Sequence, residues 1–167
     1  MTHTLFTARP IEAAALKQLR DTDDAGRACA PYPDPEGGEM LRCCLRPSAV
    51  GERIALVSYA PLRRWAAETG AKPGAYDEQG PVFIHAEECE GPGDGGGYPF
   101  ARPGALRALR RYDAEGRIAG GRLLEIPEAV TEAFDGALRE AFALPGVVLV
   151  HVRAVEYGCF QFEVRQR

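Results

Sequence analysis

The sequence predicts an α+β fold. We expect a single domain over residues 1–167, with a largely antiparallel sheet, two main helices packed against it and long loops rich in proline and glycine. Three observations predict this class. Strand patterns occur in consecutive pairs joined by short turns, two separate segments have helical periodicity, and 167 residues can bury one core but are short for two.

Two segments have the apolar spacing of amphipathic helices. The first is predicted over residues 10–21, where Pro10 suits the first turn because no N–H is needed there. The second is predicted over residues 127–143, where every third or fourth residue is apolar. Pro145 and the glycine after it end that helix.

Shorter elements occupy the first half of the chain. Residues 54–59 are apolar on both faces, which is typical of a central strand. Residues 82–86 form a second such strand, and residues 5–8 a short first one. A short helix is predicted over residues 62–69, with its leucine and tryptophan buried.

Two hairpins follow in the second half. The segments 106–112 and 117–124 are joined by Asp-Ala-Glu-Gly, a turn sequence. The closing pair is 147–153 and 159–164. Consecutive hairpins of this kind predict antiparallel pairing.

The longest loop covers residues 23–38, which are rich in proline, glycine and aspartate. Its length exceeds what a mere connection requires. The glycine-rich stretch 91–97 resembles a phosphate-binding loop only in composition, because no Lys-Ser or Lys-Thr follows and no helix begins directly after it. We interpret it as a surface loop.

Composition limits the classes of partner. The net charge is −4, which argues against a general nucleic-acid-binding protein, since phosphate contacts need a basic surface. The chain contains no apolar run near the about 18 residues needed to cross a bilayer. Residues 1–6 lack the features of a secretory signal. We therefore expect a cytoplasmic protein without nucleic-acid or membrane partners.

The five cysteines do not suggest a disulfide framework, because their number is odd and their spacing irregular. They are Cys29, Cys43, Cys44, Cys89 and Cys159.

The first closing strand carries two polar residues in an apolar, β-branched run. His151 and Arg153 point to the same side, because successive side chains of a strand alternate between faces. With an even number of residues in the next loop, they share a face with the aromatic residues of the segment 159–164. With an odd number, they face its polar residues, Glu163 among them, on a surface that could be open.

Several segments resemble a known family, the bacterial domain-of-unknown-function family 1203. The resemblance covers most of the chain and lies in residues 41–46, 51–53, 58–61, 80–89, 111–113, 150–154 and 158–160. Family members often have Cys-Arg-x-Cys-Leu in the first of these. Here Leu41 replaces the first cysteine, while Arg42 and Cys44 remain and Cys43 is an extra thiol. This departure argues against a Cys-x-x-Cys redox pair. The resemblance implies a bacterial protein but no activity.

The main functional hypothesis is a polar pocket that binds a small anionic ligand. Its predicted members are Arg42, Cys44, His85, His151 and Arg153. A buried arginine needs a partner, and its planar fork suits a carboxylate or phosphate. A nearby histidine could act as acid or base at neutral pH.

A structural interpretation stands beside it. Glu87, Glu156 or Asp113 could neutralise the arginines in internal salt bridges, and each histidine could donate to a backbone carbonyl. The protein would then be a structural or interaction domain in which these residues are polar pairs of the core.

A metal site for zinc or another borderline-soft ion is an alternative. Its candidate ligands are Cys44, His85, Cys89, His151 and Cys159. His85 and Cys89 have a spacing that could chelate locally. However, the chain has no Cys-x-x-Cys or His-x-x-x-His pair, and we assign no metal or other cofactor from the sequence.

A thiol enzyme that uses Cys44 or Cys159 is a further alternative, with the thiol activated by a neighbouring arginine or histidine. The surroundings of both cysteines differ from known protease signatures.

Overall fold

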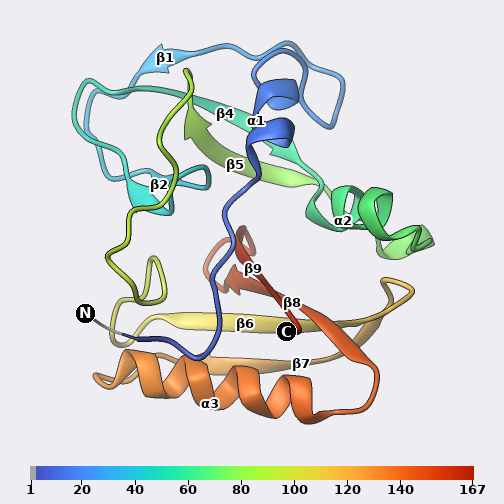
Figure 1. Ribbon diagram of the computed structural model, residues 1–167. Helices are drawn as coiled ribbons and strands as arrows, with labels where there is room; N and C mark the ends of the chain where they lie inside the picture. Colours follow the sequence, from blue (N-terminus) through green and yellow to red (C-terminus); the bar gives the residue numbers. More distant parts are fainter. Residues whose placement is uncertain (1–2) are drawn as a thin grey trace. The chain divides into compact units, whose positions relative to one another are not determined.

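Three α-helices and two β-sheets are present in residues 3–167, the part of the chain that this computed structural model describes (Figure 1). Apart from one parallel pair, all strand pairs are antiparallel within this part. The predicted α+β class is therefore confirmed. The strands are divided between two sheets, whereas the sequence suggested one.

The chain divides into two compact units built from alternating segments. Unit 1 contains residues 3–9, 61–78 and 95–167, and unit 2 contains residues 10–60 and 79–94. Each unit holds one of the sheets. This division does not decide whether the chain is a single domain over residues 1–167, which stays a prediction.

Unit 2 holds the five-stranded sheet, in the order β1-β4-β5-β2-β3. Its elements are helix α1 (Ala13–Leu19) and strands β1 (Tyr32–Pro33), β2 (Met40–Leu41), β3 (Arg46–Pro47), β4 (Arg53–Tyr59) and β5 (Gly80–His85). The central strands bury Ile54, Ile84 and Leu41 completely. Both edge strands are only two residues long, and each contains a proline.

Two pairings around β5 position the later site. Strand β2 pairs with β5 in parallel, with Leu41 opposite Phe83, and the N–H of Arg42 donates to the Phe83 carbonyl at 2.9 Å. Strand β4 pairs with β5 antiparallel, with Ile54 opposite His85. Residues just after β2 and just before β4 are thereby brought to the end of β5.

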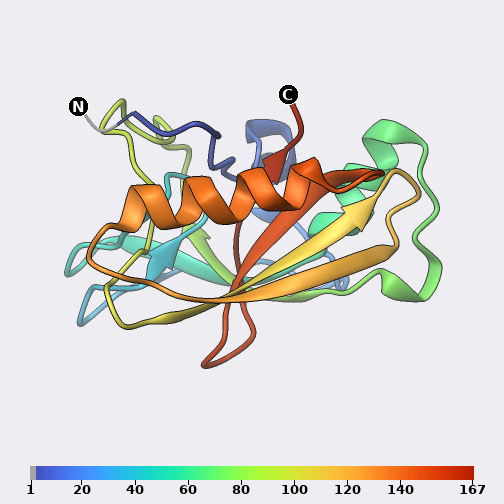
Figure 2. The ribbon, with the colours of Figure 1, turned by 90° about the horizontal axis from the view of Figure 1, so that it is seen from below.

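Unit 1 holds the four-stranded antiparallel sheet, in the order β7-β6-β8-β9. Its elements are helix α2 (Pro61–Thr69), the 3₁₀ turn η1 (Gly74–Tyr76), strands β6 (Leu106–Asp113) and β7 (Ile118–Glu125), helix α3 (Val130–Ala143), and strands β8 (Val147–Ala154) and β9 (Phe160–Arg165). Helix α3 runs along one face of this sheet (Figures 1 and 2).

The core of unit 1 beneath α3 is aromatic. Phe134 is fully buried, with its ring centroid 4.8 Å from that of Tyr98 and 6.2 Å from that of Phe162. A second cluster joins Trp65 of α2 to Tyr112 and Leu149 of the sheet. Each helix therefore attaches to the sheet through large buried side chains, which explains why the amphipathic pattern of these segments was readable in the sequence.

The predicted strand over residues 54–59, the helix over 62–69 and both hairpins are confirmed. The first helix is shorter than predicted, at Ala13–Leu19. The predicted strand over residues 5–8 is wrong, since only Arg9 makes an isolated bridge, to Glu163. A segment of four residues without a pairing partner does not form a strand, because its backbone N–H and C=O groups lack the hydrogen bonds of a ladder.

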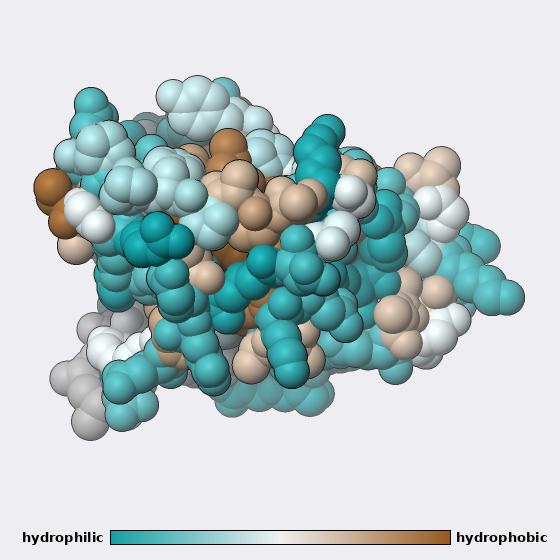
Figure 3. Space-filling view, turned by 90° about the horizontal axis from the view of Figure 1, so that it is seen from above, coloured by the Kyte–Doolittle hydropathy of each residue, from teal (hydrophilic) through white to brown (hydrophobic). Residues whose placement is uncertain are grey.

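Several large apolar side chains are exposed at the surface. On the face shown in Figure 3, hydrophilic residues predominate and apolar ones lie in small groups among them. The most exposed large apolar residues are Tyr157, Val50, Leu123 and Leu56. Scattered residues of this kind are ordinary on a protein surface. Within the described residues, no helix is both long and apolar enough to span a membrane.

The substitution Phe134→Ala should destabilise unit 1 by about 3–5 kcal/mol, because it removes a fully buried ring and leaves a cavity. The matched control is Arg139→Ala on the exposed side of the same helix, which should change the stability by less than about 0.5 kcal/mol. Urea unfolding followed by the fluorescence of Trp65, the only tryptophan, measures both. Equal effects of the two substitutions would contradict the proposed packing.

Candidate functional site

The site lies in unit 2, where a short turn meets the end of β5. Because Leu41 pairs with Phe83 in parallel, Cys43 and His85, each two residues further on, come side by side. The N–H of His85 donates to Cys43 Sγ at 3.2 Å. The strand pairing therefore places a thiol and an imidazole together without any sequence proximity.

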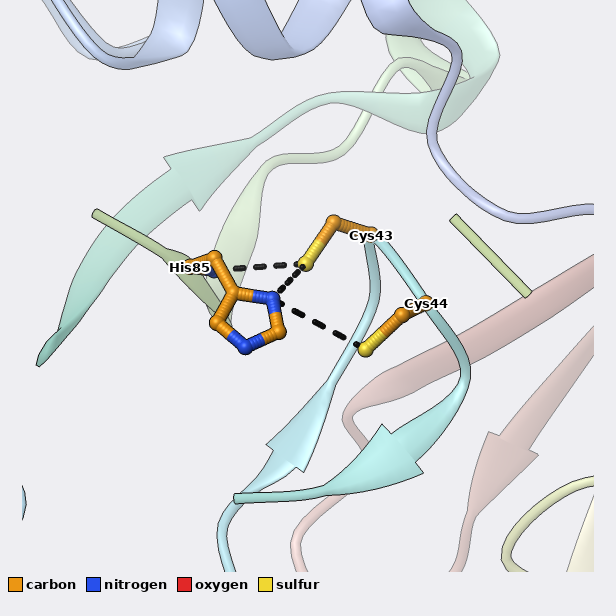
Figure 4. Close-up of side chains that lie close together, drawn as sticks. All are labelled: Cys43, Cys44 and His85. Carbon is orange, nitrogen blue, oxygen red and sulfur yellow. Dashed lines mark hydrogen bonds between the residues drawn. The ribbon is translucent and has the colours of Figure 1, made fainter. Parts of the chain in front are cut away.

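The turn itself covers residues 42–45 between β2 and β3. Leu45 closes it with a φ of 57°, and its N–H donates to the carbonyl of Leu41 at 2.9 Å. A leucine in the left-handed region is uncommon. The tight turn points both adjacent cysteines toward His85 (Figure 4).

The two sulfurs share one ring nitrogen. Cys43 Sγ is 3.2 Å and Cys44 Sγ 3.8 Å from Nδ1 of His85. All three side chains are buried, with Cys43 1%, Cys44 6% and His85 8% exposed. Within residues 3–167, these three form the one group of potential metal ligands whose donor atoms lie within 4.8 Å of one another.

The other ring nitrogen of His85 is bound to a carboxylate. Nε2 is 2.6 Å from Oε1 of Glu52, the residue just before β4. Since a carboxylate only accepts, Nε2 carries the proton and donates it. In the neutral ring, Nδ1 is then left as an acceptor that faces the sulfurs.

Glu52 is held in turn by Arg46 and by the backbone. Arg46 Nη2 donates to Oε1 at 2.8 Å, Arg46 Nη1 to Oε2 at 3.3 Å, and the N–H of Ala49 to Oε2 at 2.7 Å. The Arg46 hydrogen bonds, the Ala49 N–H and His85 lower the pKa of Glu52 to about 2 against the effect of burial. Glu52 is therefore ionised at neutral pH.

The two thiols have unequal acidity. The hydrogen bond from Cys43 lowers the pKa of Cys44 below its ordinary value; the N–H of Arg46 and the charges of His85 and Arg46 add to this effect, and burial opposes it. The same hydrogen bond, together with burial, raises the pKa of Cys43. When one of the two thiols loses its proton, Cys44 therefore loses it first, and Cys43, the more deeply buried of the two, keeps its own.

A cavity of about 470 Å³ opens beside this cluster. Cys44 and His85 lie in its wall, while Cys43 does not. The rest of the lining consists of Arg46, Glu52, Arg53, Glu87, Glu88, Cys89, Glu90 and Gly91. Four glutamates and two arginines leave the lining acidic overall.

The structure brings together only some of the predicted site residues. Cys44 and His85 are neighbours, and Arg42 lies in the same turn as Cys44, 4% exposed, with its guanidinium donating to the Met40 carbonyl. His151 and Arg153 belong to unit 1. A pocket shared by all five residues stays a prediction.

His151 is a fully buried residue of unit 1. It lies opposite Glu163, as the odd-loop alternative requires, and its Nε2 is 2.9 Å from Oε1 of that carboxylate. The surface suggested for that alternative is not open at His151, because the rings of Tyr112 and Phe160 cover it, with centroids 4.9 and 5.2 Å away. Nδ1 of His151 has no hydrogen-bond partner among the described residues.

Arg153 does not share the register of His151. A β-bulge between Val152 and Arg153 moves Arg153 opposite Phe160. Its guanidinium donates to the Gly158 carbonyl at 3.0 Å and lies 3.8 Å from the carboxylate of Glu78.

The carboxylates predicted as partners of the arginines lie elsewhere. Glu87 pairs with Arg53 and Glu156 with Arg107. Asp113 accepts hydrogen bonds from turn N–H groups. Of the two predicted site arginines, Arg153 has an acidic neighbour, Glu78, which was not among the carboxylates expected.

The remaining metal candidates from the sequence are separated. Cys89 lines the cavity beside Cys44. Cys159 belongs to unit 1, where its thiol is 3.8 Å from the Tyr157 carbonyl. Among the described residues all cysteines are free thiols.

Sequence reasoning missed three members of the site, Cys43, Arg46 and Glu52. Cys43 was set aside as an extra thiol next to Cys44. Arg46 and Glu52 fall within segments that carry the family resemblance, so the position of these segments was the available signal. Their charge gave none, since exposed arginines and glutamates are common.

The fold and the cluster define an α+β protein with a buried thiol–imidazole–carboxylate site. The model of one family, described as protein of unknown function (DUF1203), matches residues 38–166. The chain belongs to this family, as its resemblance suggested. The matched region includes Cys43, Cys44, Glu52 and His85. Comparison with curated proteins and with solved structures found no match.

Lowering the pH should reduce the stability of unit 1 because of the buried His151. Burial lowers the pKa of His151 below 6.5, against the opposing effect of Glu163. The unfolded chain therefore binds more protons than the folded one once the pH falls below about 6.5, and the free energy of unfolding falls with it. One proton limits the slope to about 1.4 kcal/mol per pH unit.

Urea unfolding followed by Trp65 fluorescence between pH 7.5 and 5 measures this slope, and His151→Gln should flatten it. Carboxylates with lowered pKa values, such as Glu163, act only at lower pH. An imidazole NMR titration that places the pKa of His151 at or above 6.5 would contradict the prediction.

Proposed function

We propose that Cys43, Cys44 and His85 bind a zinc ion, with Glu52 holding the imidazole in position. The proposal rests on the different partners of the two ring nitrogens of His85. Nε2 is 2.6 Å from the Glu52 carboxylate, while Nδ1 faces two sulfurs. Metal-binding histidines use this arrangement, because a carboxylate on the far nitrogen fixes the tautomer and makes the near nitrogen a better ligand.

The distances fit a tetrahedral ion. With zinc about 2.05 Å from nitrogen and about 2.3 Å from sulfur, the nitrogen–sulfur separation is about 3.6 Å. The two separations here, 3.2 and 3.8 Å, lie on either side of that value. Only small side-chain movements are needed to place an ion between the three atoms.

The charges also support a divalent cation. Two thiolates in a buried site would repel each other and the nearby Glu52, which is costly without a counter-charge. Arg46 offsets Glu52 through its two hydrogen bonds. A divalent ion offsets the thiolates, so the loaded cluster is neutral overall.

Three protein ligands leave one position of a tetrahedral ion open. Cys44 and His85 face the cavity, so this position would open toward it. Zinc enzymes keep such a position for a water molecule or substrate, whereas structural sites fill it with a fourth side chain. Reduced thiols suit a bacterial cytoplasm, and residence there is part of the proposal.

The small anionic ligand that the sequence predicted would, in this proposal, bind to the zinc ion itself. A carboxylate or phosphate would bind the metal at its open position, near Arg46 and Arg53. The glutamates of the cavity outnumber these arginines, which favours a cation over an anion as the first ligand to enter.

A thiol enzyme is the second candidate. It is favoured by the position of Cys44, which lines the cavity and lies beside a histidine bound to a carboxylate. A thiol nucleophile, a base and an orienting carboxylate form the usual activation chain. The two candidates use the same atoms, but only one of them requires metal.

The full chain, purified without chelator, should contain about one zinc ion per chain by elemental mass spectrometry. Cys43→Ser, Cys44→Ser and His85→Ala should each weaken zinc binding by at least about 100-fold, since each removes a ligand outright. Cys159→Ser serves as the matched control and should bind as the wild type does.

A wild-type chain that neither contains zinc nor takes it up would overturn the metal proposal. Alkylation of Cys44 that is fast in this metal-free protein and slowed by His85→Ala would then support the thiol enzyme. The zinc measurements and the alkylation measurements use the same set of variants.

Glu52→Gln should weaken zinc binding about 10- to 100-fold while leaving all ligands in place, because it removes the charge that orients and polarises His85. The matched control is Glu87→Gln, which removes a carboxylate from the same cavity that pairs with Arg53 instead. Competition titration against a coloured chelator measures both. Equal weakening by the two variants would mean that Glu52 acts only through its general charge.

A further inference from the structure

A third cysteine lies beside the proposed zinc site. Cys89 lines the same cavity as Cys44 and His85 and is half-buried. Its sulfur lies outside the group of donor atoms that are within 4.8 Å of one another.

The chain between β5 and Cys89 is short and anchored at its start. The N–H of Ala86 donates to the Arg53 carbonyl at 3.1 Å, and Glu87 pairs with Arg53 at 2.9 Å. Three residues lie between His85 and Cys89, so the Cα atoms of these two residues are at most about 14 Å apart. A sulfur on this tether can reach an ion that is bound to His85.

Beyond this anchor, no regular element restrains Cys89. Residues 86–105 contain neither a helix nor a named strand. Five of the seven residues 91–97, which follow soon after Cys89, are glycines. Glycine gives the backbone the freedom to move at small steric cost.

We propose that Cys89 is the fourth ligand of the zinc ion and completes a site of three thiolates and one imidazole by moving inward from the cavity wall. The inference rests on the zinc site proposed above. Its basis is the placement of Cys89 on the cavity toward which the open position faces, on a short tether from a ligand histidine. With Cys89 bound, all four positions of the zinc would be filled by side chains, as in structural sites, and with Cys89 at the cavity wall the fourth position would be open to a ligand.

The surroundings of Cys89 suit this role. Glu87, Glu88 and Glu90 flank it in the cavity lining, and carboxylates at an entrance raise the local concentration of cations. A zinc ion would meet these groups first and then bind the buried sulfurs. Inward movement of Cys89 would close the site behind it.

The test compares the full-length wild type with Cys89→Ser, and uses Cys29→Ser as the matched control because Cys29 is a half-buried thiol of the same unit. Zinc alone is the probe. X-ray absorption of the loaded wild type should give three sulfur neighbours and one nitrogen, and Cys89→Ser should give two sulfurs. Zinc affinity should fall at least about tenfold in Cys89→Ser and stay unchanged in Cys29→Ser.

A second readout does not depend on any variant. Alkylation of the wild type, followed residue by residue by mass spectrometry, should show Cys89 protected when zinc is present and reactive when it is removed. Two sulfurs in the loaded wild type, with Cys89 equally reactive in both states, would overturn the fourth ligand and leave the three-ligand site standing. A wild type that binds no zinc would overturn both.

Discussion

The pairing of β2 with β5 is the constraint on which the site depends. One hydrogen bond, from the N–H of Arg42 to the Phe83 carbonyl at 2.9 Å, fixes the turn after β2 against the end of β5. A shift of this pairing by one residue would turn the neighbouring side chains to the other face. The thiols would then no longer meet His85. A strand of two residues thus determines the position of the chemistry.

Both buried histidines are bound to a glutamate through Nε2, yet they differ in their second nitrogen. His85 directs Nδ1 at two sulfurs beside a cavity. His151 has aromatic rings around it and no partner for Nδ1 among the described residues. The same pair of side chains therefore lies beside a cavity in one unit and inside the core in the other, because the surroundings decide which atoms remain accessible.

The sequence predicted the elements whose signals are local. The stripe of α3, the central strand β4 and both hairpins follow from periodicity within a few residues. The site was predicted only in part, since Cys44 and His85 were identified but Glu52 and Arg46 were not. Glu52 reaches His85 because β4 pairs with β5, and Arg46 because it follows the turn after β2. The pairing of β2 with β5 joins a single pair of residues, which leaves no alternation to read. The bulge beside Arg153 likewise has no signature in its own residues.

The two edge strands of the five-stranded sheet affect how this sheet can meet other molecules. These strands are β1 and β3, and one of the two residues in each is a proline, Pro33 in β1 and Pro47 in β3. Proline offers no N–H, and a two-residue strand presents few groups to a passing chain. The sheet is thereby protected against strand addition from other molecules.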